Sequence, residues 1–317
     1  MARVLVTGGA GFIGSHLCEA GLRVGEEVTA VDDLSTGSVR NLPHGVRLVQ
    51  GDLREPGLSK ALLDEFRPDV VYHLAAQSSV VRSLSDPSHD QEVNVGGTLA
   101  LLEACRAAKK PPALVYASTG GASYGDPEKL PVSEEHPTEY RSPYGASKHV
   151  AEHYVSLYAK LFGLRTVSLR FANIYGPRQR GDLEAGVVSI FAQRLAEGSP
   201  IVLYGNGEAT RDYVFVTDAV EALRLAARKG APGEAYNVGT GIATRVEELL
   251  GLLARAMGVE PARVDRAPLR PGEIFRIALD SSRLNQATGW KPRYTLGEGV
   301  AAFAEWFREN HSSAGDP

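Results

Sequence analysis

The stretch VLVTGGAGFIG at residues 4–14 decides the fold of this 317-residue chain. It begins with a short run of aliphatic and β-branched side chains, which is typical of a buried strand. Gly8, Gly11 and Gly14 follow, and a helical pattern continues after them. Their spacing is a GxxGxxG variant of the dinucleotide fingerprint, in which glycines allow a tight turn and close approach of a pyrophosphate. Alone, such a run could be an ordinary strand-to-helix turn, but its place after the first strand favours a dinucleotide site.

The strand-then-helix pattern of this first unit repeats along the following part of the chain. Short apolar runs at residues 28–31, 47–50, 70–73 and 114–117 alternate with helical patterns. This alternation predicts an α/β fold built on a Rossmann-type, doubly wound parallel sheet. Because ligands of such sheets bind at the carboxyl ends of the strands, the loop after each strand is a candidate for chemistry.

The alternation loosens from about residue 175, where glycine- and proline-rich loops become frequent. This change indicates a smaller C-terminal substrate-binding domain. We expect a dinucleotide-binding domain at 1–172, to which about 213–240 return, and a domain at 173–317 that mainly binds substrate. The short polar tail at 311–317 is expected to be frayed.

Composition narrows the classes of function. The net charge of −4 and the pI near 6.1 give no broad basic surface, so we expect no nucleic-acid partner. The N-terminal apolar run is too short for a signal peptide or a membrane helix, and we expect a cytoplasmic protein without a membrane partner. Cys18 and Cys105 fall in apolar helical patterns and are expected to be buried free thiols. We expect no metal site.

Acidic residues at strand ends point to the nature of the dinucleotide. Asp32 lies at the end of the second strand, with Asp33 next to it. A carboxylate there can accept both ribose hydroxyls of NAD and would repel a 2′-phosphate, so NAD is expected rather than NADP. Asp52 follows the third strand, where it can meet the adenine edge or cap a helix.

The segment SPYGASK at residues 142–148 combines a helix start with a catalytic pattern. Ser142 is expected as the N-cap and Pro143 in the first turn, which places Tyr144 and Lys148 one turn apart on one face. Tyr144 is the expected acid/base, because a lysine ammonium beside a phenol favours the phenolate. The alternative is a helix that carries an exposed lysine and a half-buried tyrosine.

Together these motifs resemble those of the extended short-chain dehydrogenase/reductase family, and the resemblance extends over nearly the whole chain. Within that family the chain is most similar to bacterial UDP-sugar 4-epimerases. The matching pieces are TGGAGFIGSH at 7–16, GDLR at 51–54, HLAAQ at 73–77, NVGGT at 94–98, STGGASYG at 118–125, SPYGASK at 142–148, LRFANIYGPRQ at 169–179 and RDYVFVTD at 211–218.

The resemblance implies a set of residues that contact NAD, with Asn94 holding the helix at the cofactor side of the sheet. The expected set is Gly8, Gly11, Phe12, Ile13, Gly14, Asp32, Asp33, Asp52, Leu53, Leu74, Ala75, Ala76, Gln77, Asn94, Ser118, Tyr144, Lys148 and Phe171.

The family's third catalytic group is a hydroxyl that hydrogen-bonds the sugar 4-hydroxyl beside the tyrosine. Counting back from Tyr124, as in the commonest epimerase pattern, lands on Gly120, so this chain departs from the pattern by one residue. We expect the role to fall on Thr119, with Ser118 and Ser123 as alternatives. Any of these hydroxyls could instead satisfy backbone groups of a loop.

The resemblance also implies residues for a UDP-sugar substrate. Two arginines would bind the diphosphate, which guanidinium forks suit well, and an acid would accept a ribose hydroxyl. Each arginine could also be an ordinary surface charge. The expected substrate residues are Asn173, Val188, Arg211, Arg270 and Glu273.

The resemblance implies NAD-dependent 4-epimerisation of a UDP-hexose, between UDP-glucose and UDP-galactose, through a 4-keto intermediate with Tyr144 as the acid/base. UDP-N-acetylglucosamine and UDP-glucuronate remain alternative substrates. Ile277 lies near the position that gates bulk at C2, and its middling size does not decide between hexoses and N-acetylhexosamines. A dTDP-glucose 4,6-dehydratase would carry an Asp-Glu pair where Gly120 and Gly121 stand, and a UDP-glucuronate decarboxylase would carry a glutamate in that loop. A non-catalytic NAD-binding sensor or scaffold is a further alternative. A homodimer through the helices near 90–108 and 143–162 is expected from the resemblance.

Overall fold

Seven parallel strands form the central sheet of the protein. The computed structural model describes residues 1–181 and 186–311. The sheet order is β11-β6-β5-β4-β1-β2-β3, so the chain moves outward from β1 in one direction and then crosses to β4 and continues in the other. The switch point between β1 and β4 is where such sheets bind dinucleotides. The strands are β1 (Arg3–Thr7), β2 (Glu27–Asp32), β3 (Arg47–Gln50), β4 (Val70–His73), β5 (Ala113–Thr119), β6 (Thr166–Phe171) and β11 (Ala235–Val238).

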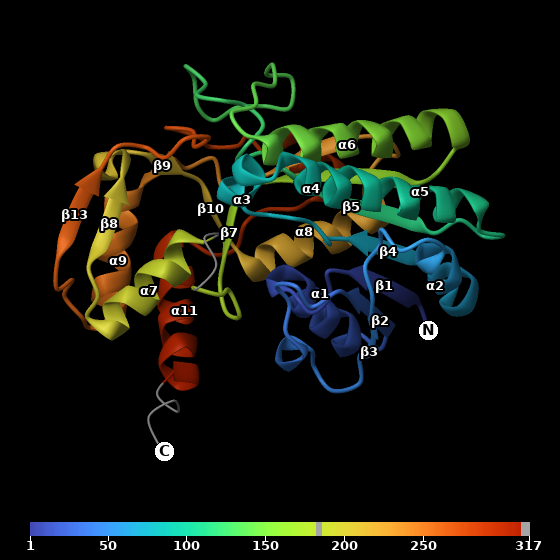
Figure 1. Cartoon of the computed structure of the whole chain (residues 1–317), viewed down its shortest axis with the longest axis horizontal. Helices are drawn as coiled ribbons and strands as arrows, with labels where there is room; N and C mark the ends of the chain where they lie inside the picture. The colour runs from blue at the N-terminus through green and yellow to red at the C-terminus, as the bar shows by residue number, and fades with distance from the viewer. Residues whose placement is uncertain (182–185, 312–317) are drawn as a thin grey trace.

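Helices cover both faces of this sheet (Figure 1). On one face α1 (Phe12–Arg23) packs against α8 (Val216–Lys229), and on the other α2 (Leu58–Phe66) and α6 (Pro143–Phe162) pack against α5 (Gly97–Ala107). Three short elements lead into α5: α3 (Val80–Ser85), α4 (Pro87–Gln91) and a π-helical turn (Glu92–Gly96).

Alternation along the strands gives each face its own apolar core. Val4 and Val6 lie in the cluster that α1 and α8 complete, whereas Leu5 between them lies in the cluster under α5 and α6. This is the period of two that a strand requires. Both cysteines are buried free thiols, as predicted, with Cys18 in the first cluster and Cys105 in the second.

A second, smaller lobe follows the sheet (Figure 1). Its core joins aromatic and aliphatic side chains such as Phe191, Leu203, Leu253 and Phe303. Its elements are β7 (Asn173–Tyr175), α7 (Val187–Glu197), β8 (Ile201–Tyr204), β9 (Thr210–Arg211), β10 (Tyr213–Phe215), β12 (Thr244–Arg245), α9 (Val246–Met257), β13 (Val264–Ala267) and α11 (Leu296–His311). The remaining short elements are 3-10 turns at Val39–Asn41 and Gly205–Gly207 and the helix α10 (Ser282–Thr288), which packs against α8.

The predicted fold class is confirmed. All five strands expected from the sequence are present, although the fifth is longer than expected and ends at Thr119. β11 pairs with β6 at the edge of the central sheet, so the chain returns to the first lobe after entering the second. Across the described ranges, no helix has both the length and the apolar character needed to cross a membrane. Residues 312–317 of the tail lie outside the described part of the chain.

Candidate functional site

The glycine turn after β1 packs so closely that side chains are excluded. Gly8 has a φ of +67°, and a Cβ built on it would lie 2.8 Å from the backbone nitrogen of Ala75. A Cβ on Gly14 would overlap the carbonyl oxygen of Gly8. Gly11 is the N-cap of α1 and provides no side-chain cap, so the first amide groups of this helix face outward without a partner from its side chain. The turn therefore fits a pyrophosphate at a helix N-terminus.

Asp32 lies buried beside this turn with capacity for further hydrogen bonds. Its two carboxylate oxygens accept the backbone N–H groups of Ala10 and Leu34, each at 2.9 Å. Burial raises the pKa of Asp32, and these N–H groups oppose that rise. Since a carboxylate has about four acceptor positions, room remains for ribose hydroxyls.

The other two acids are held by local contacts. The exposed Asp33 accepts the backbone and hydroxyl groups of Ser35. Asp52 pairs with Arg54 at 2.6 Å, and this hydrogen-bonded guanidinium lowers the pKa of Asp52. Asp52 does not cap α2, whose N-cap is Gly57. An adenine contact by Asp52 remains a prediction.

Lys148 is buried on the inner face of α6. The helix begins as expected, with the Ser142 hydroxyl accepting the backbone N–H of Gly145 at 3.2 Å. Only 3% of Lys148 is exposed, and its Nζ lies 4.3 Å from the ring centroid of Tyr116. Burial lowers the pKa of Lys148 to about 7, while the carboxylates of Asp90 and Glu152 raise it. The exposed lysine of the alternative is thus wrong, whereas Tyr144 is half-buried, as that alternative also expected.

Tyr144 faces the end of β5. Burial raises the pKa of Tyr144 to about 12, and a hydrogen bond with the Thr119 side chain opposes that rise. In the protein alone the pKa of this phenol thus lies above its usual range, which is opposite to the shift expected from its lysine neighbour. The desolvation of a buried phenolate outweighs the favourable contacts.

Among the three candidate hydroxyls, Thr119 is the one that meets Tyr144. Ser123 donates to the carbonyl oxygen of Thr119 at 2.5 Å and is fully buried. The hydroxyl of Ser118 is buried and has no hydrogen-bond partner. A Cβ built on Gly121 would lie 3.6 Å from Asn173 Oδ1 and 4.0 Å from Thr119 Oγ1, so these two polar groups border the same small space.

The loop after β4 is tied to the helices by a buried polar network. Asn94 accepts the backbone N–H of Gln77 at 2.9 Å and donates to the Gln77 carbonyl at 3.1 Å. The Gln77 side chain donates to Ser79 and to Asp90. Asn94 and Gln77 thus shape the loop with their side chains, and their contacts with a cofactor remain predictions.

The remaining expected cofactor residues lie around the ends of β4, β5 and β6. Leu74 and Ala75 donate their backbone N–H groups to the Thr7 hydroxyl, and Ala76 is half-buried. The Phe171 carbonyl accepts the backbone N–H groups of Gly120 and Gly121. Three apolar members of the set take part in packing at different levels: Leu53 is buried, Ile13 packs against the first core cluster, and Phe12 is half-buried.

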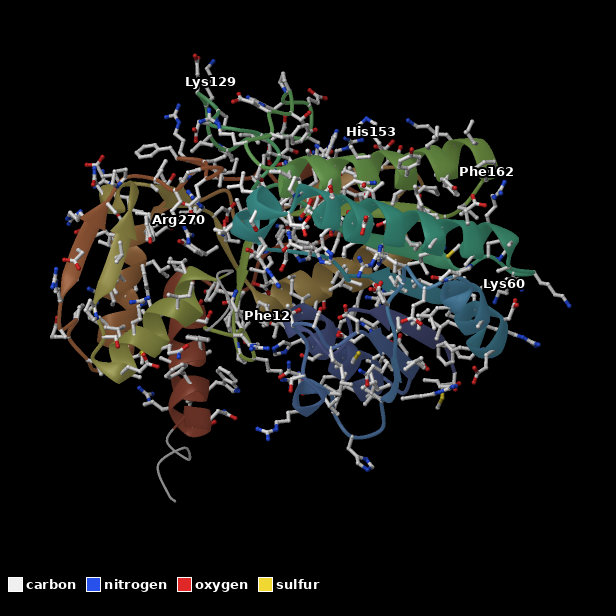
Figure 2. The ribbon with its side chains drawn as sticks, viewed as in Figure 1. Phe12, Lys60, Lys129, His153, Phe162 and Arg270 are labelled. Carbon is white, nitrogen blue, oxygen red and sulfur yellow. The ribbon has the colours of Figure 1, made fainter. Side chains whose placement is uncertain are left out.

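The two arginines expected to bind substrate have different contacts on the second lobe. Arg270 pairs with Glu273 at 2.6 Å, and its guanidinium lies 4.7 Å from the ring centroid of Tyr204. Arg211 donates to the carbonyl oxygens of Thr210 and Phe275. Figure 2 shows Arg270 on the second lobe and Phe12 at the start of α1 on the first.

One expected substrate residue does not join this group. Val188 is 1% exposed and lies in the core of the second lobe. A substrate contact through its side chain stays a prediction, and the burial of this side chain does not favour it.

Sequence reasoning missed two residues. The signal that could have identified Tyr204 is its position directly before the Gly-Asn-Gly loop at 205–207. Asp90 was signalled only by an acid four residues before Asn94, a spacing that places both on one helix face. Across the described residues, no group of three or more His, Cys, Asp or Glu side chains could hold a metal ion.

Comparisons with known proteins agree with this geometry. The model of the NAD dependent epimerase/dehydratase family matches residues 4–239. A UDP-glucose 4-epimerase of Mycolicibacterium smegmatis is 43% identical, covering 96% of this chain and 98% of that protein. The structure of a Thermus thermophilus UDP-glucose 4-epimerase in complex with NAD is 47% identical over 96% of this chain and 99% of that one, with a TM-score of 0.92. A UDP-N-acetylglucosamine 4-epimerase from Methanobrevibacter ruminantium is 30% identical over 98% and 99%, with a TM-score of 0.89.

Proposed function

The chain belongs to the NAD-dependent epimerase/dehydratase family, and we propose that it interconverts UDP-glucose and UDP-galactose by epimerisation at C4. One observation carries this proposal. The phenol of Tyr144 meets the hydroxyl of Thr119 beside the buried Lys148, in a loop that has glycines at positions 120 and 121. This arrangement provides a proton acceptor for a sugar hydroxyl and no additional acid.

The family's cofactor is NAD, and the residues of the first lobe fit it. We propose that the glycine turn at 8–14 holds the pyrophosphate, that Asp32 accepts the ribose hydroxyls, and that the loop at 74–77 lines the nicotinamide half. When bound, NAD supplies the removal and return of a hydride at sugar C4 and is unchanged at the end of the cycle.

Tyr144 is proposed to carry the proton of the sugar 4-hydroxyl. As a phenolate it accepts that proton at its oxygen, and as a phenol it gives the proton back after the sugar has turned its other face. Thr119 can hydrogen-bond both the phenol and the sugar hydroxyl, which aligns the transfer. The ammonium of Lys148 stabilises negative charge nearby and so opposes the effect of burial on Tyr144.

The second lobe is proposed to hold the nucleotide. A UDP-sugar brings two negative charges, and the guanidinium groups of Arg211 and Arg270 are suited to them. Arg270 already lies over the ring of Tyr204, whose exposed face could stack on a base. Glu273 is proposed to accept a ribose hydroxyl, and Asn173 to meet the diphosphate.

Packing at the glycine pair favours epimerisation over dehydration. A Cβ on Gly120 would lie 3.1 Å from one methyl group of Leu279 and overlap the other, so an acid at this position requires Leu279 to move. Gly121 is less crowded, and a Cβ there would make ordinary contacts. The chain thus lacks both acids of a dehydratase. At the first of the two positions, Gly120, the packing of Leu279 also leaves no room for an acidic side chain unless Leu279 moves.

The 2-substituent of the sugar defines the second candidate function. The solved structure of an N-acetylglucosamine-type 4-epimerase shares this fold at 30% identity. Ile277 is fully buried, so its side chain reaches the sugar pocket only if neighbouring residues move.

The test is proton NMR of the purified protein mixed separately with UDP-galactose and UDP-N-acetylgalactosamine, without added NAD. Conversion of UDP-galactose alone supports the proposal, and conversion of both shows a permissive pocket for the C2 substituent. If neither sugar is converted even after NAD is supplied, the proposal is wrong. A sensor that binds NAD but turns over no nucleotide-sugar then becomes the better account.

We also propose a cytoplasmic homodimer that associates through α5 and α6. Its support is a row of exposed apolar side chains on α6, at Val150, Leu157, Leu161 and Phe162. Figure 2 shows Phe162 at the C-terminal end of this helix. Light scattering should give twice the chain mass of 33.9 kDa, and a Leu157→Glu variant should give the mass of one chain.

A further inference from the structure

Asp90 is a fully buried acid that is hydrogen-bonded to Ser147 of α6. Its Oδ2 accepts the hydroxyl of Ser147 at 2.5 Å, and its Oδ1 accepts the side-chain amides of Gln77 at 2.7 Å and Asn94 at 3.2 Å. All three donors are neutral groups. A buried carboxylate is costly unless it is also balanced by a positive charge, so the structure calls for a cation near Asp90.

Lys148 is a buried cation whose pKa the Asp90 carboxylate raises, so the two charges interact. The charged and titratable groups that interact with Lys148 are Asp90 from α4, Glu152 from α6, Tyr116 from β5 and His73 from β4, and Tyr144 lies one turn earlier on α6. The carboxylate of Glu152 is already bound by the guanidinium of Arg170 at 2.6 Å. Burial lowers the pKa of His73 to about 3, so this imidazole is neutral.

The contacts of Asp90 also reach the groups that shape the cofactor loop. Asn94 donates to Ser147 at 3.0 Å as well as to Asp90, and it holds the backbone of Gln77 on both its N–H and its carbonyl side. Ser147 lies between Tyr144 and Lys148 along α6. One acid therefore connects the catalytic helix with the loop that follows β4.

We propose that Asp90 is a positioning residue for the reaction: it fixes the Tyr144–Lys148 face of α6 against the loop at 74–77, and its charge balances the ammonium of Lys148. This inference rests on the proposed function, because it concerns the same proton transfer.

Removal of the charge has a signature that a loss of structure would not produce. The carboxylate of Asp90 raises the pKa of Lys148 and also that of Tyr144. Both values should therefore fall when the charge is removed, by about one pH unit for a nearby buried charge. If activity needs an ionised Tyr144 and a protonated Lys148, both limbs of the pH profile move to lower pH together.

The experiment compares Asp90→Asn with Asp86→Asn by measuring kcat for UDP-galactose between pH 5 and pH 10. Asp86 is exposed and caps α4 by accepting the backbone N–H of His89, a role that asparagine fills equally well. We expect both limbs to move for Asp90→Asn and neither to move for Asp86→Asn. A lower kcat with unmoved limbs would overturn the proposal. If Asp90→Asn does not fold, Asp90→Ser makes the same charge change with a smaller side chain.

A second measurement separates this proposal from the proposed function. In the cofactor-free protein, the unfolding free energy should rise with pH from near the pKa of Lys148, because the unfolded chain binds a proton that the folded protein releases. Asp90→Asn should move the start of that rise to lower pH by about one unit. If the wild-type protein is inactive but this shift occurs, the proposed function fails while the link between Asp90 and Lys148 stands. If neither the limbs nor this rise shifts, the proposal about Asp90 is wrong.

Discussion

The two sides of the site use charge in opposite ways. On the first lobe, Lys148 is 3% exposed and its neighbours Tyr144 and Asp90 are held by hydrogen bonds inside the protein. On the second lobe, the Arg270 side chain is 33% exposed and pairs with Glu273 next to an exposed tyrosine ring. Burial moves the pKa values of Lys148 and Tyr144 strongly, whereas solvent screens the charges on the second lobe. We therefore expect the first side to carry out the proton transfer and the second side to bind the anionic ligand.

A substitution at Tyr144 on the first lobe should have the largest effect. Replacement of Tyr144 by Phe removes the group that accepts the proton, and kcat should fall by about three orders of magnitude, as for loss of a general base. Bound NAD, followed by its absorbance after gel filtration, should remain. Tyr154→Phe is the matched control, since Tyr154 is a half-buried tyrosine further along the same helix. A Tyr144→Phe variant with near-normal kcat would contradict the assignment.

The buried charge of Lys148 predicts a stability effect. Its pKa is about 7 in the folded protein and 10.5 at its ordinary value, so between these pH values the unfolded chain binds more protons and the unfolding free energy rises with pH. Lys148→Met should abolish this rise, because methionine binds no proton in either state.

Urea unfolding at pH 6, 7.5 and 9 measures this effect. Lys160→Met is the control, because Lys160 is exposed on the same helix and should leave the curve unchanged. A rise that persists in Lys148→Met would show that the pH dependence comes from other groups.

On the second lobe, mutation should affect binding rather than turnover. Arg270→Leu removes one charge-assisted contact with the diphosphate, and KM should rise by about 10- to 100-fold with little change in kcat. Arg266→Leu is the control, since Arg266 pairs with Glu247 on the same lobe. A fall in kcat at constant KM would mean that Arg270 acts on the reaction itself.

The smallest effect is expected at Thr119. Thr119→Val keeps the shape of the side chain but removes the hydroxyl that lowers the pKa of Tyr144. The loss of one hydrogen bond should reduce kcat about tenfold, and the acid limb of the pH profile should move upward. Ser123→Ala should change kcat much less, because its hydroxyl bonds only a backbone carbonyl. The reverse ranking would assign the catalytic role to Ser123.

Much of the first lobe could be predicted from local sequence. The glycine turn, the strand rhythm and the helix start at Ser142 depend on backbone geometry and periodicity, which the residues themselves specify. Asp90 could not be predicted as a partner of Lys148, because the two residues are far apart in the chain and meet only through packing of α4 on α6. The position of Val188 in a core was missed for the same reason, since burial follows from tertiary contacts.

The central claim is that Tyr144 exchanges only a hydroxyl proton while the hydrogen at C4 leaves and returns within one active site. The most direct measurement follows UDP-galactose carrying deuterium at C4 during conversion in ordinary water, by NMR and mass spectrometry. The account predicts that the product has the glucose configuration and keeps its deuterium at C4. Loss of that deuterium to water would contradict it.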